Sequence, residues 1–207
     1  MISRNNLKNF LLSILAGMCI GIGGAAFLSV GSTVGAVLFS FGLACVIVFG
    51  LKLFTGMAGI FTFKDKGFVN LLIALFGNII GCLITARAIA CYSILPVQDA
   101  ARAIASARMT AGVIRCYSLA IGCGFIVDLS VRAAKQGKWI VLIFGIPTFI
   151  LCGFPHCVAD AFYIFCLPVE YFSLFIIPIL CNYIAVIIGN FIGCNIYRLF
   201  TCITSEQ

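Results

Sequence analysis

The sequence has 207 residues, of which 63% are hydrophobic and only 9% are charged, and its mean hydropathy is +1.22. A soluble core of this size does not need so much apolar surface, so the composition excludes a soluble globular protein and predicts a polytopic helical membrane protein. The apolar residues form continuous runs without alternating polar positions, which excludes a transmembrane barrel.

Six apolar segments follow one another, and each is long enough to cross a hydrocarbon core about 30 Å thick as a helix. Residues 1–9 are polar, but no small-residue cleavage pattern precedes a globular remainder, so we interpret the first segment as a membrane span and not as a signal peptide. All segments but the first and fourth exceed a straight span, so they must tilt or break. The segments cover residues 10–30, 34–63, 68–95, 111–131, 139–167 and 171–197.

Basic residues favour one orientation of these segments. With a cytoplasmic N-terminus, most loop Lys and Arg residues fall on the inside, as the positive-inside rule requires. The net charge of +7 is therefore a topology signal, and we expect no nucleic-acid partner. We predict a multi-pass protein of the cell (inner or plasma) membrane with both termini in the cytoplasm. The inside set is Arg4, Lys8, Lys64, Lys66, Arg132, Lys135, Lys138 and Arg198, and the outside set is Arg102 and Arg108.

The fifth segment contains Gly153, Pro155 and the only histidine of the chain, His156. An unbroken helix over residues 139–167 would be about 44 Å long at ~1.5 Å per residue. Proline removes a backbone donor and glycine tolerates unusual dihedral angles, so we expect the helix to break here. Broken backbone at membrane depth persists only where protein or a water-filled path surrounds it, which makes His156 a candidate for a substrate pathway. A satisfied histidine at a structural kink is the alternative.

A short motif occurs twice, at the same ordinal place in each triplet of segments. Gly-Asn-x-x-Gly-Cys covers residues 77–82 and residues 189–194. Three spans per half place the halves in opposite orientations, so we predict two inverted repeats. They would cover residues 1–107 and 108–207 of a single transmembrane domain over 1–207.

The second segment should then break as the fifth does. It carries Lys-Leu-Phe-Thr-Gly over residues 52–56, past its midpoint. Gly56 weakens a helix, and the Thr55 hydroxyl offers a partner to freed backbone groups or to a substrate. Two broken helices, one from each half, are typical of a substrate site near the membrane midplane.

Twelve cysteines are scattered through the apolar segments, where cysteine behaves as a small hydrophobic residue. They form no Cys-x-x-Cys pair and no Cys/His spacing typical of a metal site, so we expect no disulfide, metal or other cofactor. One histidine without an acidic cluster or a Ser/His/Asp set provides little catalytic machinery, so we do not expect an enzyme.

Taken in order, these motifs resemble the formate/nitrite transporter family. The resemblance rests on Leu-Phe-Thr-Gly in the second segment, Gly-Asn-x-x-Gly in the third and sixth, and Gly-Phe-x-His in the fifth, and it covers about residues 10–200. Family members are homopentamers of aquaporin-like protomers, and each protomer carries small monovalent anions such as formate, nitrite or hydrosulfide, often with protons. The resemblance implies an all-α membrane protein with six transmembrane helices, the second and fifth broken, assembled as a homopentamer in a lipid bilayer.

The resemblance also implies roles for residues near the two breaks. Leu53, Phe54 and Thr55 would form the loop that breaks the second span. His156 would be the central histidine that faces Thr55, and Asn190 matches the family asparagine of the last span.

Four further positions match constrictions and a mouth of the family pore. Phe39 and Leu43 match the apolar residues of the cytoplasmic constriction, and Phe149 matches an aromatic residue of the periplasmic constriction. Arg108 matches a lysine near the outer vestibule. For each apolar residue, packing or contact with lipid is the alternative.

Several positions around the central site depart from the family pattern. Lys52 stands where the family commonly has an acid, and Pro155 where it has Glu. Asp160 and Gly124 each replace an asparagine. Because Lys52 is newly basic and Asp160 newly acidic, we hypothesise that these two side chains pair.

The favoured function is a channel or proton-linked carrier for small monovalent anions or their weak acids. A bare anion loses much solvation in an apolar constriction and a neutral acid does not. His156 could exchange a proton with the permeant, because the ordinary pKa of histidine lies near neutrality. The alternatives are a pore for small neutral solutes of the water, ammonia or urea type, which the lost polar groups at Gly124 and Pro155 favour, and a closed structural or regulatory subunit.

Overall fold

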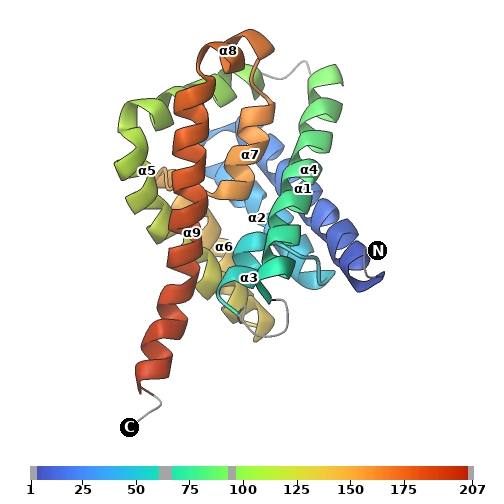
Figure 1. Ribbon diagram of the computed structural model, residues 1–207, viewed down its shortest axis with the longest axis vertical. Helices are drawn as coiled ribbons and strands as arrows, with labels where there is room; N and C mark the ends of the chain where they lie inside the picture. Colours follow the sequence, from blue (N-terminus) through green and yellow to red (C-terminus); the bar gives the residue numbers. More distant parts are fainter. Residues whose placement is uncertain (1–3, 61–66, 93–96, 205–207) are drawn as a thin grey trace.

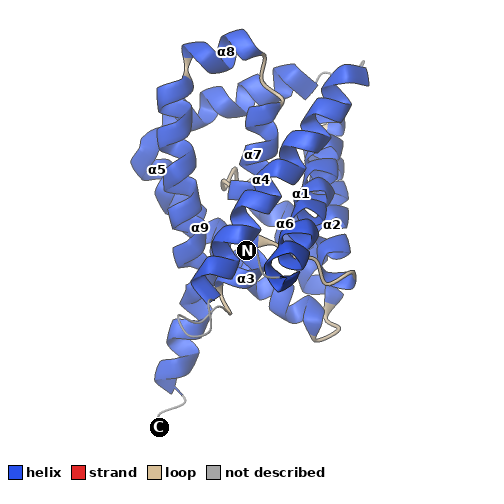
Figure 2. Cartoon of the chain, turned by 45° about the vertical axis from the view of Figure 1, so that its right-hand side comes forward, coloured by secondary structure: helices blue, strands red, loops and turns tan. Residues whose placement is uncertain are grey.

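The computed structural model describes residues 4–60, 67–92 and 97–204, so Lys64 and Lys66 lie outside the described residues. Over these ranges all regular structure is helical, and the helices pack into one bundle (Figures 1 and 2). The helices are α1 Arg4–Val30, α2 Ser32–Val48, α3 Phe54–Ala58, α4 Gly67–Tyr92, α5 Val97–Lys135, α6 Trp139–Leu151, α7 Cys157–Phe165, α8 Val169–Leu174 and α9 Ile176–Thr204.

Four of these helices are long and apolar enough to cross a membrane: α1, α4 over Gly67–Ile89, α5, and α9 over Ile176–Ile203. Helices α2 and α6 are apolar but shorter, with 17 and 13 residues. Large apolar side chains on several of these helices point outward, as on α9, where Ile188 is 48% exposed. Apolar surface of this kind is stable in contact with lipid tails and unfavourable in contact with water.

The bundle consists of two similar sets of helices. Helix α1 packs along α4 and beside α2, and α5 packs in the same way along α9 and beside α6, while α2 and α6 contact each other. The short helices α3 and α7 lie in the middle of the bundle, with α7 in the upper half and α3 in the lower half of Figures 1 and 2.

Glycines of the repeated motif allow the long helices to approach closely. A Cβ atom at Gly81 of α4 would overlap the Ile14 carbonyl of α1, and a Cβ atom at Gly193 of α9 would overlap the Ile121 carbonyl of α5. These positions therefore cannot carry a side chain without moving a helix.

Gly124 has the same kind of role in the contact between α5 and α9. A Cβ atom there would overlap the Asn190 carbonyl, and the Gly124 carbonyl accepts from Cys194 Sγ at 3.3 Å. On α1, the Gly17 carbonyl accepts from Cys82 Sγ at 3.4 Å in the same way. Gly124 thus packs against the backbone of Asn190, the residue that binds the chain on both sides of His156.

The helices of the two sets are interrupted at the positions that matter for the site. Helix α2 ends at Val48, the chain turns at Gly50 with φ +62°, and α3 begins at Phe54. Helix α6 ends at Leu151, the chain turns at Gly153 with φ +70°, and α7 begins at Cys157. Only glycine adopts a positive φ without strain, so these two glycines permit the turns.

A buried asparagine satisfies the backbone at the first interruption. Asn78 of α4 is fully buried, and its Oδ1 accepts from the Phe54 N–H at 2.8 Å. Its Nδ2 donates to the Lys52 carbonyl at 2.9 Å and to the Ser13 carbonyl at 2.8 Å. The amide thus holds the two backbone groups of Lys52 and Phe54 at the break and ties them to the backbone of α1.

Asn190 of α9 makes the equivalent contacts at the second interruption. Its Oδ1 accepts from the Cys157 N–H at 2.7 Å, and its Nδ2 donates to the carbonyls of Pro155 at 3.0 Å and Ala120 at 2.8 Å. Asn190 is also fully buried. The asparagines of the repeated motif are therefore not replaceable by apolar residues that would merely fill the same space.

The structure differs from the sequence analysis before the fourth segment. That segment was expected to begin at residue 111, but α5 begins at Val97 and continues through a kink at Gly112, where φ is 78° and ψ is 166°. The stretch before the kink is rich in alanine, which favours a helix, and it buries Ala101 completely. The expected boundary between residues 107 and 108 consequently lies inside α5.

We predict that Asn190→Ala destabilises the protein by about 2–4 kcal/mol, because two or more buried backbone groups lose their partner at about 1–3 kcal/mol each. The matched control is Asn195→Ala on the same helix, because Asn195 Nδ2 donates to the Phe191 carbonyl of its own helix, one turn earlier, at 2.8 Å. Thermal unfolding in detergent measures both variants. Equal losses in the two variants would contradict the special role of Asn190.

Candidate functional site

The two helix interruptions meet at a hydrogen bond between Thr55 and His156. Thr55 lies in the first turn of α3 and His156 immediately precedes α7, and Thr55 Oγ1 lies 3.1 Å from His156 Nε2. Thr55 is fully buried and His156 is 3% exposed. The structure therefore brings together the pair of polar residues that the sequence analysis placed at the two breaks.

His156 also caps the N-terminus of α7. Its Nδ1 accepts from the Ala159 N–H at 3.2 Å. An accepting nitrogen carries no proton, so this network assigns the proton of the neutral ring to Nε2, which donates to Thr55 Oγ1. A second proton on Nδ1 would set two donors against each other and remove the cap from α7.

Aromatic rings pack on one side of the histidine. The Phe149 and His156 ring centroids are 5.7 Å apart, and the Phe39 ring meets Phe149 edge-on at 6.1 Å. The sequence analysis assigned Phe39 and Phe149 to two separate constrictions. They are in contact here, so they form a single apolar stack beside His156.

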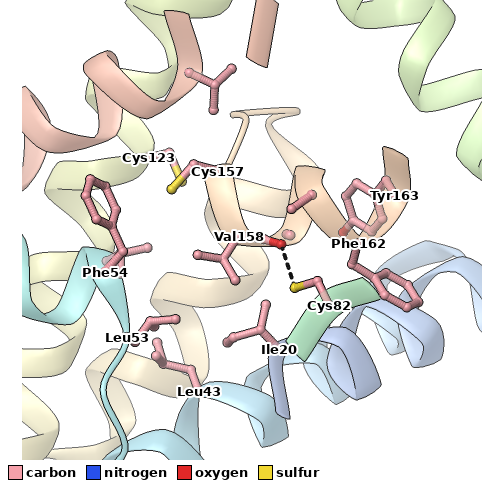
Figure 3. Close-up of a cluster of buried hydrophobic side chains, with 14 of the residues drawn as sticks. Ile20, Leu43, Leu53, Phe54, Cys82, Cys123, Cys157, Val158, Phe162 and Tyr163 are labelled. Carbon is pink, nitrogen blue, oxygen red and sulfur yellow. Dashed lines mark hydrogen bonds between the residues drawn. The ribbon is translucent and has the colours of Figure 1, made fainter. Parts of the chain in front are cut away.

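The first turn of α7 lies in the centre of the apolar core between the two interruptions. Figure 3 shows Val158 among Leu43 and Leu53 on the α3 side and Tyr163 farther along α7. The Val158 carbonyl accepts from Cys82 Sγ of α4 at 3.2 Å, drawn as a dashed line in Figure 3. This cluster surrounds the Thr55–His156 pair with buried apolar side chains.

A cavity of about 170 Å³ lies beside His156 and is lined by residues of α5, α6 and α7. We call it the α7-side cavity, and His156 and Phe149 form part of its wall. Its other lining residues include Arg108, Gly153, Asp160 and Tyr163.

A second cavity, of about 150 Å³, lies on the other side of the apolar centre. We call it the α3-side cavity, and Leu43 and Leu53 form part of its wall. Thr55 and Phe39 line neither cavity, so they belong to the packed layer between the two. The other lining residues of the α3-side cavity include Lys52, Gly56, Val131 and Lys135.

An ion pair occupies the wall of the α7-side cavity. Arg108 Nε lies 3.3 Å from Asp160 Oδ2, and Arg108 NH1 donates to the Gly153 carbonyl at 2.6 Å. The hypothesis that Asp160 pairs with Lys52 is wrong, because Arg108 from α5 reaches Asp160 first and Lys52 lies on the α3-side cavity.

Two residues of this region were not among the predicted site residues. Asn78 holds the loop before Thr55, and the repeated Gly-Asn-x-x-Gly-Cys motif was the signal that could have placed it beside Asn190. Tyr163 lines the α7-side cavity and is 6% exposed. Its position at i+7 from His156, on the same face as Asp160 at i+4, could have indicated its place. Across the described ranges, no three His, Cys, Asp or Glu side chains converge as metal ligands would.

A family model for the formate/nitrite transporters matches residues 1–202. The chain belongs to the formate/nitrite transporter family. Among curated formate/nitrite transporters, the formate channel FocB of Escherichia coli strain K12 is 27% identical in an alignment that covers 83% of this chain and 71% of FocB. A formate-nitrite transporter of Entamoeba histolytica is 28% identical over 90% of this chain and 61% of its own length.

Solved structures of formate/nitrite transporters share the fold. A pentameric formate channel with formate bound has a TM-score of 0.83 and 22% sequence identity, with all of both chains covered. A second structure, described as an FNT family ion channel, also has a TM-score of 0.83, with 20% identity over 98% of this chain and 92% of its own.

We predict that Arg108→Ala destabilises the protein by about 3–5 kcal/mol, because it leaves the buried Asp160 carboxylate without its partner. Arg102→Ala is the control, since the Arg102–Asp99 pair is on the surface, with side chains 44% and 77% exposed, and such pairs contribute about 0–1 kcal/mol. Thermal unfolding in detergent gives both values. The double variant Arg108→Leu/Asp160→Leu should recover part of the loss, and a further additive loss would contradict the pairing.

Proposed function

We propose that this protein is a membrane channel or proton-linked carrier for small monovalent anions or their weak acids, of the formate, nitrite or hydrosulfide type. The permeant passes between the α7-side cavity and the α3-side cavity by way of Thr55 and His156. The observation that carries the proposal is the 3.1 Å contact between Thr55 Oγ1 and His156 Nε2, where two interrupted helices meet between two cavities. Membership of the formate/nitrite transporter family supports it.

The proposal includes a six-span architecture in which α2 with α3, and α6 with α7, are the two broken spans. The matching contacts of Asn78 and Asn190 support two equivalent halves, and so does the packing of α1 on α4 and of α5 on α9. With three spans in each half, the halves are inverted in the membrane of the cell, and both termini are cytoplasmic.

The proposal also includes a homopentamer embedded in lipid, in which each protomer holds its own pathway. The pentameric formate channel that shares the fold supports this assembly. Outward apolar side chains such as Phe41, 59% exposed, and Ile188 supply surface for neighbouring protomers or lipid tails. A mass in native detergent that corresponds to a monomer or dimer would contradict the pentamer.

The apolar centre decides which form of the substrate crosses. Phe39, Phe149 and Leu43 are each at most 3% exposed, and they provide no polar partner for an anion that has lost its water. Desolvating an anion there is far more costly than desolvating its neutral acid. The Thr55 hydroxyl and the His156 Nε2–H are polar groups at this level, and the permeant receives its hydrogen bonds from them.

Proton exchange at His156 is coupled to the start of α7. The ring gives up the Nε2 proton to a permeant only if Nδ1 takes another proton, and Nδ1 is the acceptor that caps the Ala159 N–H. Proton transfer therefore requires the first turn of α7 to release its cap. This couples the protonation of the permeant to a small movement at the wall of the α7-side cavity.

A pore for small neutral solutes is the second candidate, and one observation favours it. The Arg108 charge in the α7-side cavity is compensated by Asp160, so that wall has no net attraction for anions. Flux through proteoliposomes separates the two functions: formate, nitrite and hydrosulfide are measured against urea and ammonia. Selective flux of the first three supports the anion transporter, and selective flux of urea or ammonia contradicts it.

We predict that His156→Asn removes the pH dependence of formate flux between about pH 5 and pH 8, because asparagine retains a hydrogen-bond donor but does not titrate. The flux itself should persist at a reduced level if the variant remains folded and assembled. Flux is measured across that pH range in proteoliposomes, with native mass as the assembly control. An unchanged pH profile would show that His156 is a structural residue at a kink.

A further inference from the structure

The two cavities differ in charge. Lys52 and Lys135 line the α3-side cavity, and no Asp or Glu is among its described lining residues. In the described part of the chain, the ion pairs are Arg102–Asp99, Arg108–Asp160 and Arg132–Asp128, so neither lysine has a carboxylate within salt-bridge distance. Lys135 interacts electrostatically with Asp128, which lines the adjoining larger cavity. The uncompensated positive charge among the described lining residues of the α3-side cavity is therefore that of Lys52, whereas the wall of the α7-side cavity is compensated.

The backbone of Lys52 is fixed by two other helices. Its carbonyl accepts from Asn78 Nδ2 of α4 at 2.9 Å, and its N–H donates to the Leu12 carbonyl of α1 at 3.4 Å. The side chain is half-buried, and the next residue, Leu53, is only 1% exposed. A positive charge is thus held directly before the apolar centre.

We propose that Lys52, with Lys135 at the rim, forms an anion-binding site in the α3-side cavity that loads small monovalent anions such as formate onto the pathway. This inference rests on the proposed function and adds a binding residue and a direction to it. A small anion stabilises a partly desolvated ammonium more when no carboxylate already compensates its charge. A cavity of about 150 Å³ has room for such an anion together with water.

Arg108 does not provide a matching site in the other cavity. Its guanidinium is engaged by Asp160 and by the Gly153 carbonyl, so its charge and several of its donors are already used. Loading of anions is consequently asymmetric: it is assisted by charge on the side where α3 lies and unassisted on the side where α7 lies.

Formate uptake into membrane vesicles of both orientations, right-side-out and inverted, tests the site. Lys52→Gln should raise the half-saturating formate concentration about fivefold in one orientation, because one charge at this range contributes roughly that factor after screening. In vesicles of the other orientation, the half-saturating formate concentration should change less than about twofold. Lys52→Arg keeps the charge and should retain the wild-type value.

Lys138→Gln is the matched control, because Lys138 lines a neighbouring wider cavity but not the α3-side cavity, and the variant removes the same charge. If Lys138→Gln raises the half-saturating formate concentration as much as Lys52→Gln does, the effect comes from general surface charge and the proposed site is overturned. A rise of equal size in both orientations for Lys52→Gln would overturn it as well.

The wild-type protein provides a test that needs no variant. Raising the ionic strength from about 20 mM to about 300 mM screens the lysines, so the half-saturating formate concentration should rise in the same single orientation. No salt dependence in either orientation overturns the loading site. Absence of wild-type flux of formate, nitrite and hydrosulfide in both orientations instead overturns the proposed function, so the two failures are distinguishable.

Discussion

The structure depends on satisfying the backbone where two helices are interrupted inside an apolar bundle. An unpaired N–H or C=O group in such surroundings costs several kcal/mol, and each interruption creates a set of them. Asn78 and Asn190 solve this with one amide each, which accepts from the first N–H of the resuming helix and donates to two carbonyls. Without these amides, neither Thr55 nor His156 would be held at the centre.

Once the interruptions are fixed, the hydrogen bonds available at the centre come from a few polar groups within a layer of apolar side chains. His156 serves two helices at once, because its Nδ1 caps α7 and its Nε2 contacts Thr55 of α3. A change in the protonation of either nitrogen therefore alters the hydrogen bonds to both α7 and α3. The stack of Phe39 and Phe149 excludes water from one side of the ring, so the hydrogen bonds that remain are the ones that a permeant must use.

The charges of the protein are arranged around this layer and not within it. Buried acids are each paired with an arginine, Asp160 with Arg108 and Asp128 with Arg132, which is how charge is tolerated next to an apolar core. Lys52, by contrast, lines a cavity whose described lining residues include no carboxylate. The two ends of the proposed pathway thus differ in electrostatics although the helices around them are similar.

The sequence by itself determined the class of protein, the order of its apolar segments and the two interruptions that carry Thr55 and His156, because hydropathy, glycine and proline breaks and a repeated motif are local or periodic signals. That Thr55 faces His156 was implied only by the resemblance to the family. The sequence did not determine where Arg108 points, that Phe39 meets Phe149, or that Gly124 faces α9. Those contacts join residues far apart in the chain, and the crossing of the helices decides them. The expected start at residue 111 lies next to the non-helical Gly112, and the helical turns from Val97 to this kink were missed because they carry several charged and polar residues and do not form an apolar span.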